Sequence, residues 1–155
     1  MNKYYTPEIE EFYVGFEIEV YNQDSSKWYP YKCTIQTIQE DTLSVYGAHG
    51  LDWMLDGEDQ EHPSCRTRVK YLDREDIEEV LGVKQLKGDA IELNFQILQE
   101  DSEDFYEVDY DTDILELTVE LYKEVSENRY DCYTLFIGKI KNKSEFKKLI
   151  KQLGI

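Results

Sequence analysis

Four acidic side chains have the spacing of a calcium-binding loop. Asp109, Asp111 and Asp113 stand at alternate positions, and Glu120 is the twelfth residue of a loop that would begin at Asp109. Carboxylates at positions 1, 3, 5 and 12 of such a loop supply the oxygen ligands that Ca²⁺ prefers. However, position 6 needs glycine for a sharp turn and is Ile114, and the residues after it alternate like a strand. We therefore expect an acidic turn before a strand, with a metal site as the alternative.

Two histidines and three cysteines are the remaining candidates for catalysis or metal binding. His49 and His62 lie in one irregular stretch, whereas Cys33, Cys65 and Cys132 are far apart and form no C-x-x-C motif. This spacing predicts neither a disulfide framework nor a zinc site. No known signature of a nucleophile with its base surrounds these residues. We expect a protein that is not an enzyme and needs no cofactor.

The charge of the chain is large and unevenly distributed. The 155 residues carry a formal charge of −17, and because residues 139–155 contribute +5, residues 1–138 carry −22. An acidic body of this kind repels nucleic acid and anionic membranes, and it can attract basic partners or simply favour solubility. We expect no direct binding of nucleic acid and no association with membranes.

Acidic, loop-like stretches hold the residues that we expect to contact a partner. Residues 46–65 combine three glycines and a proline with many acids, and loops of this length are often functional. A second acidic stretch follows residue 98. Thirteen tyrosines and two tryptophans add aromatic side chains, which supply rigid contact area or pack within a sheet. The candidate residues are Trp53, Asp56, Glu58, Asp59, Asp101, Glu103, Asp104, Asp109 and Asp111.

Alternation of apolar and polar residues predicts most of the strands. Residues 32–39 and 43–46 are joined by three polar residues and indicate a hairpin. Residues 133–140 are apolar on both faces, so we expect this strand at the centre of a sheet or covered on both sides. The predicted strands cover residues 14–20, 32–39, 43–46, 68–72, 91–97, 115–121 and 133–140.

Capping residues predict two helices. Asp73 and Gly82 bound a short central helix, and Asn142 with Glu145 has the spacing of a capping box at the start of an amphipathic C-terminal helix. A single helical turn is also expected after Thr6. The fold class is therefore α+β, with a mainly antiparallel β-sheet of about five to seven strands and two short helices, in one compact domain of residues 1–155 with a single core.

The composition and the first residues of the chain indicate a globular protein inside the cell. Hydrophobic residues make up 41% and charged residues 33%, which excludes a disordered or collagen-like chain. The first residues, M-N-K-Y-Y-T-P-E, lack the apolar segment of a signal peptide, and no apolar run has the length of a membrane span. We expect a cytoplasmic protein.

Three segments carry a resemblance to a known family: Y-Y-T-P-E-I-E-E-F-Y-V-G-F-E, V-K-Y-L-D-R-E-D-I-E-E and I-K-N-K-S-E-F-K-K-L-I-K-Q-L-G-I. They resemble a family of small uncharacterised proteins encoded by phages and prophages of gut bacteria. The resemblance covers about a third of the chain. It implies a phage or mobile-element origin and the cytoplasm of a bacterial host, and it implies no activity.

Three functions fit this sequence. The leading hypothesis is an accessory protein that binds a host or phage protein through an acidic, aromatic surface, as an inhibitor or as a mimic of nucleic-acid charge. The second is a small-ligand or metal-binding protein in which residues 47–65 form a lid. The third is a structural or virion-associated subunit, which would form a homo-oligomer.

Overall fold

The computed structural model describes residues 3–22, 25–35, 67–100, 102–127 and 129–155. They form two compact units, the N-terminal unit (Asn2–Tyr71) and the C-terminal unit (Leu72–Ile155). Each unit has its own cluster of buried hydrophobic residues. The single core that we expected is therefore replaced by two clusters, while a single domain of residues 1–155 stays a prediction.

The N-terminal unit contains a four-stranded antiparallel sheet in the order β1-β4-β2-β3. Its buried cluster contains Phe12, Phe16, Ile18, Cys33 and Val69. The expected helical turn is a short 3-10 helix. The elements are β1 (Tyr4–Tyr5), η1 (Ile9–Glu11), β2 (Glu17–Asn22), β3 (Lys27–Lys32) and β4 (Thr67–Lys70).

The strand expected over residues 14–20 is shorter at its start. Gly15 has a φ of 95°, a conformation that interrupts an extended strand, so β2 begins only at Glu17 and Val14 is 56% exposed. Phe16 and Ile18 are buried as the alternation predicts. The strand expected over residues 32–39 is wrong where it is described, because β3 ends at Lys32, residues 33–34 have no regular structure and Ile35 is helical; the rest of the expected hairpin lies outside the described residues. β2 instead pairs with β3, from Glu17 with Lys32 to Asn22 with Lys27.

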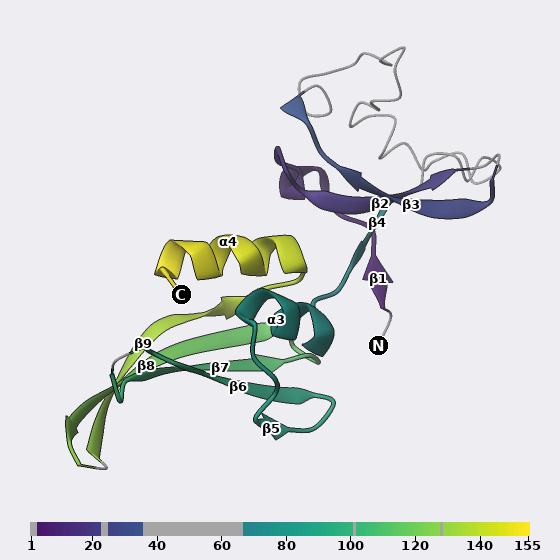
Figure 1. Ribbon diagram of the computed structural model, residues 1–155. Helices are drawn as coiled ribbons and strands as arrows, with labels where there is room; N and C mark the ends of the chain where they lie inside the picture. The colour runs from purple at the N-terminus through teal and green to yellow at the C-terminus, as the bar shows by residue number, and fades with distance from the viewer. Residues whose placement is uncertain (1–2, 23–24, 36–66, 101, 128) are drawn as a thin grey trace. The chain divides into compact units, whose positions relative to one another are not determined.

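The C-terminal unit is a five-stranded antiparallel sheet with two helices. The strands follow chain order, β5-β6-β7-β8-β9, and both helices lie along one face of the sheet (Figure 1). Residues of this helix-covered face form the core together with Ile77, Phe146, Leu149 and Ile150 of the helices. The elements are α3 (Arg74–Leu81), β5 (Lys87–Gly88), β6 (Glu92–Leu98), β7 (Phe105–Asp111), β8 (Glu116–Ser126), β9 (Arg129–Lys139) and α4 (Lys143–Leu153).

Both helices begin and end as predicted. The Asp73 carboxylate accepts a hydrogen bond from the Asp76 backbone N–H at 3.0 Å, and Gly82 ends α3 with a φ of 70°. The Asn142 side chain accepts from the Glu145 N–H at 3.0 Å, while the Glu145 carboxylate accepts from the N–H of Lys141 at 2.7 Å. These bonds satisfy backbone donors that a helix start leaves unpaired. The α+β class with one central and one C-terminal helix is confirmed.

Strand β7 corrects the expectation of an acidic turn at residues 109–113. Asp109 and Asp111 belong to β7, and their alternation with Val108 and Tyr110 is the alternation of a strand with one buried face. The turn comes after them, where the Asp111 carboxylate accepts the backbone N–H groups of Asp113 and Ile114 at 2.8 and 3.2 Å.

Strand β9 corrects a second expectation. Its apolar sequence predicted a central or doubly covered strand, yet β9 is the edge of the sheet and pairs only with β8 among the described residues. Most of its side chains are exposed, including Tyr133, Leu135 and Ile137. The pattern of apolar residues gave the strand correctly, but it contains no information about the number of neighbouring strands.

Candidate binding face

The structure places only part of the expected partner-binding set. Trp53, Asp56, Glu58, Asp59 and Asp101 lie outside the described residues. Glu103 is exposed in the loop between β6 and β7. The carboxylate of the neighbouring Asp104 accepts the backbone N–H of Glu124 at 2.9 Å, so it holds this loop against β8.

Six carboxylates lie on the face of the five-stranded sheet that the helices do not cover. The strand register aligns Glu92, Asp111 and Glu116 in one row and Glu107 with Glu120 in another, with Asp109 between them. We call this set the acidic face: Glu92, Glu107, Asp109, Asp111, Glu116 and Glu120. Among the described residues none of the six forms an ion pair. Like charges on directly opposed strand positions destabilise a sheet, so this arrangement is unfavourable for stability.

A hollow of about 470 Å³ opens over the acidic face. Its lining includes the carboxylates of β6, β7 and β8, together with Asn94 and Thr118. Lys87 of β5 is its one basic lining residue among those described. The negative charge thus surrounds a concave site rather than being spread over a flat surface.

Asn94 stands at the centre of this arrangement. Its side-chain amide donates to the Glu107 carboxylate at 2.6 Å and to the Asp109 carboxylate at 2.7 Å. Its carbonyl oxygen is buried and receives no hydrogen bond from any described residue. A buried acceptor without a donor is unfavourable by roughly 1–3 kcal/mol. A cationic group entering the hollow can pair with the carboxylates around Asn94.

Asp109 has the most perturbed carboxylate of the acidic face. Burial raises its pKa above the ordinary value, the hydrogen bond from Asn94 opposes this rise, and the charges of Glu107 and Glu120 add to it. The effects that raise the pKa of Asp109 all disfavour its ionised form, so a positive charge near this carboxylate would stabilise the ionised form.

Aromatic residues adjoin the acidic face at the other end of the same sheet surface. The rings of Phe105 and Tyr122 stack at 4.8 Å between centroids, and Tyr130 contacts Phe105 edge to face at 5.4 Å. The Tyr122 hydroxyl donates to the Glu120 carboxylate at 3.0 Å. Burial, followed by hydrogen bonds with Cys132 and Glu120, raises the pKa of Tyr122. Aromatic side chains thus lie beside the carboxylates on this sheet surface, although Phe105, Tyr122 and Tyr130 were not among the residues expected to contact a partner, and that expectation stays a prediction.

The calcium-loop residues do not converge on one point. Asp109, Asp111 and Glu120 lie in different rows of the sheet, and the Asp111 carboxylate is occupied by the turn that follows it. Among the described residues no three His, Cys, Asp or Glu side chains come together to hold a metal ion. The extended conformation of β7 and β8 spreads ligands that a calcium loop would gather.

The described thiols differ in environment. Cys33 is buried in the N-terminal unit, and burial raises its pKa to about 11, so it is a protonated thiol at neutral pH. Cys132 is exposed on β9. His49, His62 and Cys65 lie outside the described residues.

Comparison of the chain with protein-family models, with curated proteins and with solved structures found no match. Within the described residues, no helix has both the length and the apolar character needed to cross a membrane. The candidate site therefore rests on the chemistry and geometry of the acidic face.

Proposed function

We propose that this chain is a non-enzymatic accessory protein of phage or mobile-element origin that binds a host or phage protein through the acidic face. The main supporting observation is that carboxylates occupy opposed positions on neighbouring strands of the acidic face, while none of its six carboxylates forms an ion pair among the described residues. Lysine or arginine side chains of a partner would supply the positive charge that this face lacks.

The spacing of the charges supports mimicry of nucleic acid as the mode of binding. Glu107, Asp109 and Asp111 occupy alternate positions of β7, which places their Cα atoms about 6.8 Å apart along the strand. The parallel rows on β6 and β8 extend this line of charge sideways. A regular array of anions is what a phosphate backbone presents to a basic protein. The partner class is therefore a protein with a basic, nucleic-acid-binding surface.

The experiment is a pull-down of the tagged chain from a bacterial lysate, washed over a salt series and analysed by mass spectrometry. We expect a basic protein that is retained at about 0.1 M salt and released towards about 1 M, because the Debye length falls from about 10 Å to about 3 Å. In Glu107→Gln/Asp109→Asn/Glu116→Gln the affinity should fall at least about tenfold, or about 1.4 kcal/mol.

A matched control separates the acidic face from net charge. Glu10→Gln/Glu100→Gln/Glu127→Gln removes the same number of charges from exposed positions outside the face. It should retain the partner. If both triple variants lose the partner equally, the net charge of the chain explains binding and the acidic face does not. A partner whose binding does not change with salt rules out charge mimicry.

The volume of the hollow favours a second candidate function, the binding of a small organic cation. Small-molecule sites commonly enclose about 300–1,000 Å³, and the hollow lies within that range. Spermidine serves as the probe, with Ca²⁺ as the comparison. A rise in Tm with spermidine that is absent from the acidic-face triple variant would support this candidate, because a ligand of the native state raises Tm.

A further inference from the structure

The described sheets have four edges, and three of them are protected against pairing with another chain. β1 and β5 have only two residues each. β3 carries Pro30, which cannot donate a backbone hydrogen bond, and lysines at both of its ends. Short strands, proline and lysine are the usual means by which proteins protect sheet edges. The fourth edge, β9, is of a different kind.

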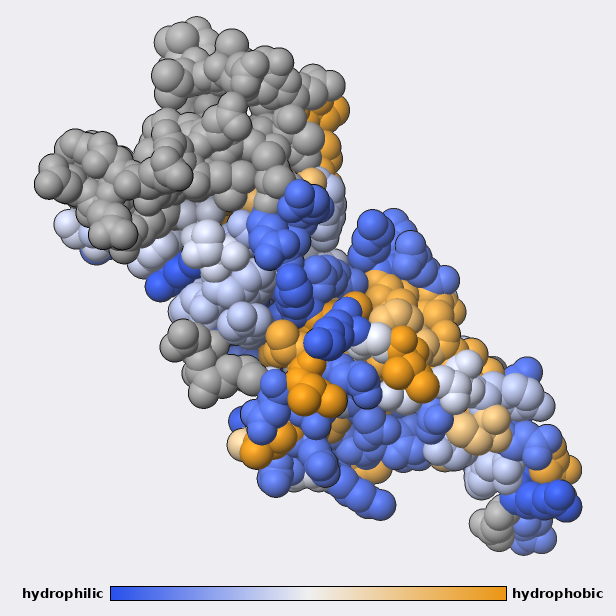
Figure 2. Space-filling model, turned by 180° about the vertical axis from the view of Figure 1, so that it is seen from behind, coloured by the Kyte–Doolittle hydropathy of each residue, from blue (hydrophilic) through white to orange (hydrophobic). Residues whose placement is uncertain are grey.

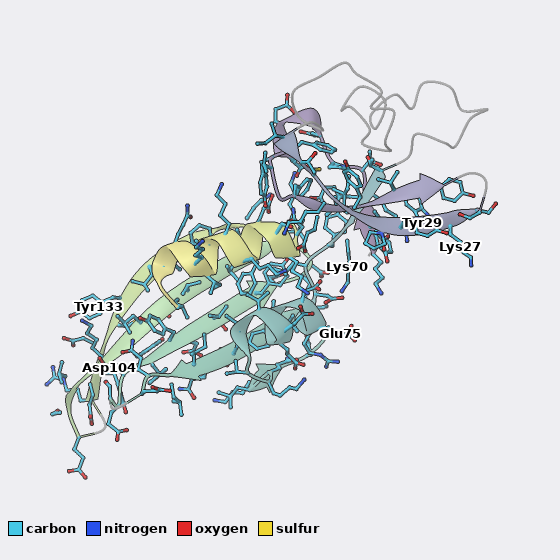
Figure 3. The ribbon with its side chains drawn as sticks, turned by 45° about the horizontal axis from the view of Figure 1, so that its top comes forward. Lys27, Tyr29, Lys70, Glu75, Asp104 and Tyr133 are labelled. Atoms are coloured by element: carbon cyan, nitrogen blue, oxygen red, sulfur yellow. The ribbon has the colours of Figure 1, made fainter. Side chains whose placement is uncertain are left out.

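β9 is a long apolar edge. It extends over eleven residues without proline, and Tyr133, Leu135 and Ile137 are 49%, 38% and 62% exposed. Tyr133 lies at the border of the sheet in Figure 3, and Figure 2 shows hydrophobic side chains of this unit exposed among hydrophilic ones. Its protective features are a β-bulge at Leu135, where the register shifts opposite Val119 and Glu120, and the basic residues Arg129 and Lys139 at its two ends, which leave the apolar residues between them unprotected. Such an edge is a template for an added strand.

The charge of β9 indicates which strand it accepts. Its charged residues are Arg129, Asp131 and Lys139, so it has a slight positive charge beside the acidic strands β7 and β8. A basic partner segment therefore finds no complementary charge on the edge strand itself. A second β9 is apolar and of equal length. In antiparallel pairing offset by two residues, Lys139 of each copy lies opposite Asp131 of the other, whereas in-register parallel pairing would bring Lys139 against Lys139 and Arg129 against Arg129.

We propose that β9 pairs antiparallel with β9 of a second copy of this chain, joining the two five-stranded sheets of a symmetric dimer. The nine residues 131–139 that pair in this register extend about 31 Å, and a strip about 10 Å wide buries roughly 300 Å² on each copy. The two copies together bury roughly 600 Å², which is less than the total of about 1,200–2,000 Å² that standard specific interfaces bury. The dimer is therefore weak and depends on protein concentration.

Salt distinguishes this dimer from the binding of a basic partner. Each copy has a formal charge of −17, so two copies repel one another at low salt. Screening by salt should strengthen the dimer, whereas it should weaken a basic partner on the acidic face. The inference does not depend on the proposed function.

The test is sedimentation-velocity centrifugation of the full chain over a range of concentrations, at about 0.1 M and about 0.5 M salt. We expect a monomer–dimer equilibrium that shifts towards dimer at higher salt. Ile137→Lys should raise the dimer Kd at least about tenfold. Leu86→Lys is the control, because Leu86 is 54% exposed but lies beside the opposite edge of the sheet.

Hydrogen exchange gives an independent measurement on the unaltered chain. The backbone amides of Arg129–Lys139 should exchange more slowly as protein concentration rises, while those of β3 should not change. A monomer at every concentration and salt would overturn the proposal. A dimer that Ile137→Lys leaves intact, or whose formation does not protect β9, would overturn it as well.

Discussion

The two units arrange charge on their sheets in opposite ways. Among the described residues of the N-terminal unit, five acidic side chains are matched by five basic ones, whereas residues 72–155 contain 21 acidic and 11 basic side chains. In the N-terminal unit Glu17 lies opposite Lys32, and Glu19 forms a 2.5 Å ion pair with Arg68. In the C-terminal unit, rows of carboxylates lie side by side, and of the six residues of the acidic face only Glu116 lies opposite a basic residue, Lys139.

Arg68 shows how completely a charge can be accommodated. Its guanidinium lies 3.7 Å from the ring centroid of Tyr4 and 4.1 Å from that of Trp28, in addition to its ion pair with Glu19. Asn94 has the contrasting environment, because it is surrounded by carboxylates and retains a buried acceptor without a donor among the described residues. The acidic residues of this chain are therefore not distributed evenly over its surface. A stability cost is concentrated on one face, as expected where residues serve binding.

The largest effects should come from the two separate cores. Phe16→Ala and Phe146→Ala each remove a fully buried ring and should destabilise their own unit by about 3–5 kcal/mol. Both tryptophans precede residue 72, so the tryptophan fluorescence of the full chain reports the N-terminal unit. Thermal unfolding followed by fluorescence should shift in Phe16→Ala and not in Phe146→Ala. An equal shift in both variants would show that the units unfold together.

An intermediate effect is expected at Arg68. Arg68→Ala removes two cation–π contacts and a half-exposed ion pair, and should lower the unfolding free energy of the N-terminal unit by about 1–2 kcal/mol. Arg68→Lys keeps the charge but not the planar group, so it should recover less than half of that loss. Denaturant unfolding followed by tryptophan fluorescence measures both variants. Full recovery by lysine would indicate that charge alone matters here.

The smallest effect is expected at Asp109, where a substitution should raise the unfolding free energy instead of lowering it. Its pKa is raised in the folded protein, so the folded state binds the proton more tightly and loses stability as pH rises through that pKa. Asp109→Asn should therefore stabilise the C-terminal unit, by roughly 0.5 kcal/mol after screening by solvent. Calorimetry at several pH values should show this gain at neutral pH and its disappearance in acid. A loss of stability at neutral pH would contradict the like-charge description of the acidic face.

Local features of the sequence were sufficient to predict the helices and several of the strands. Asp73, Gly82 and Asn142 act within a few residues, so their caps are visible in sequence alone. β6 and β8 alternate clearly. β3 was not predicted because Pro30 is unfavourable in a central strand but acceptable at an edge. β7 was not predicted because its aspartates suggested a turn, although Tyr106, Val108 and Tyr110 had the alternation of a strand.

The sheet neighbours and the site could not be deduced in the same way. The edge position of β9 and the division into two sheets depend on pairing between distant residues. Asp109, Asp111 and Glu120 were chosen as candidates from their spacing, but Asn94, Glu92 and Glu107 join them only through strand register. Alternation in β6 could have indicated that Glu92 and Asn94 share a face.

The position of α4 at the end of the chain determines when each unit can fold during synthesis. The N-terminal unit is complete at Tyr71, whereas the core of the C-terminal unit needs Phe146, Leu149 and Ile150 of α4, whose last residue follows 82 positions later. At about 5–20 residues per second, the ribosome needs roughly 4–16 s for this interval. During that time the apolar face of the growing five-stranded sheet has no helix α4 to cover it. Slow translation after residue 71 should therefore favour aggregation of the nascent chain, and chaperones that bind exposed sheet surfaces should have their greatest effect in this window.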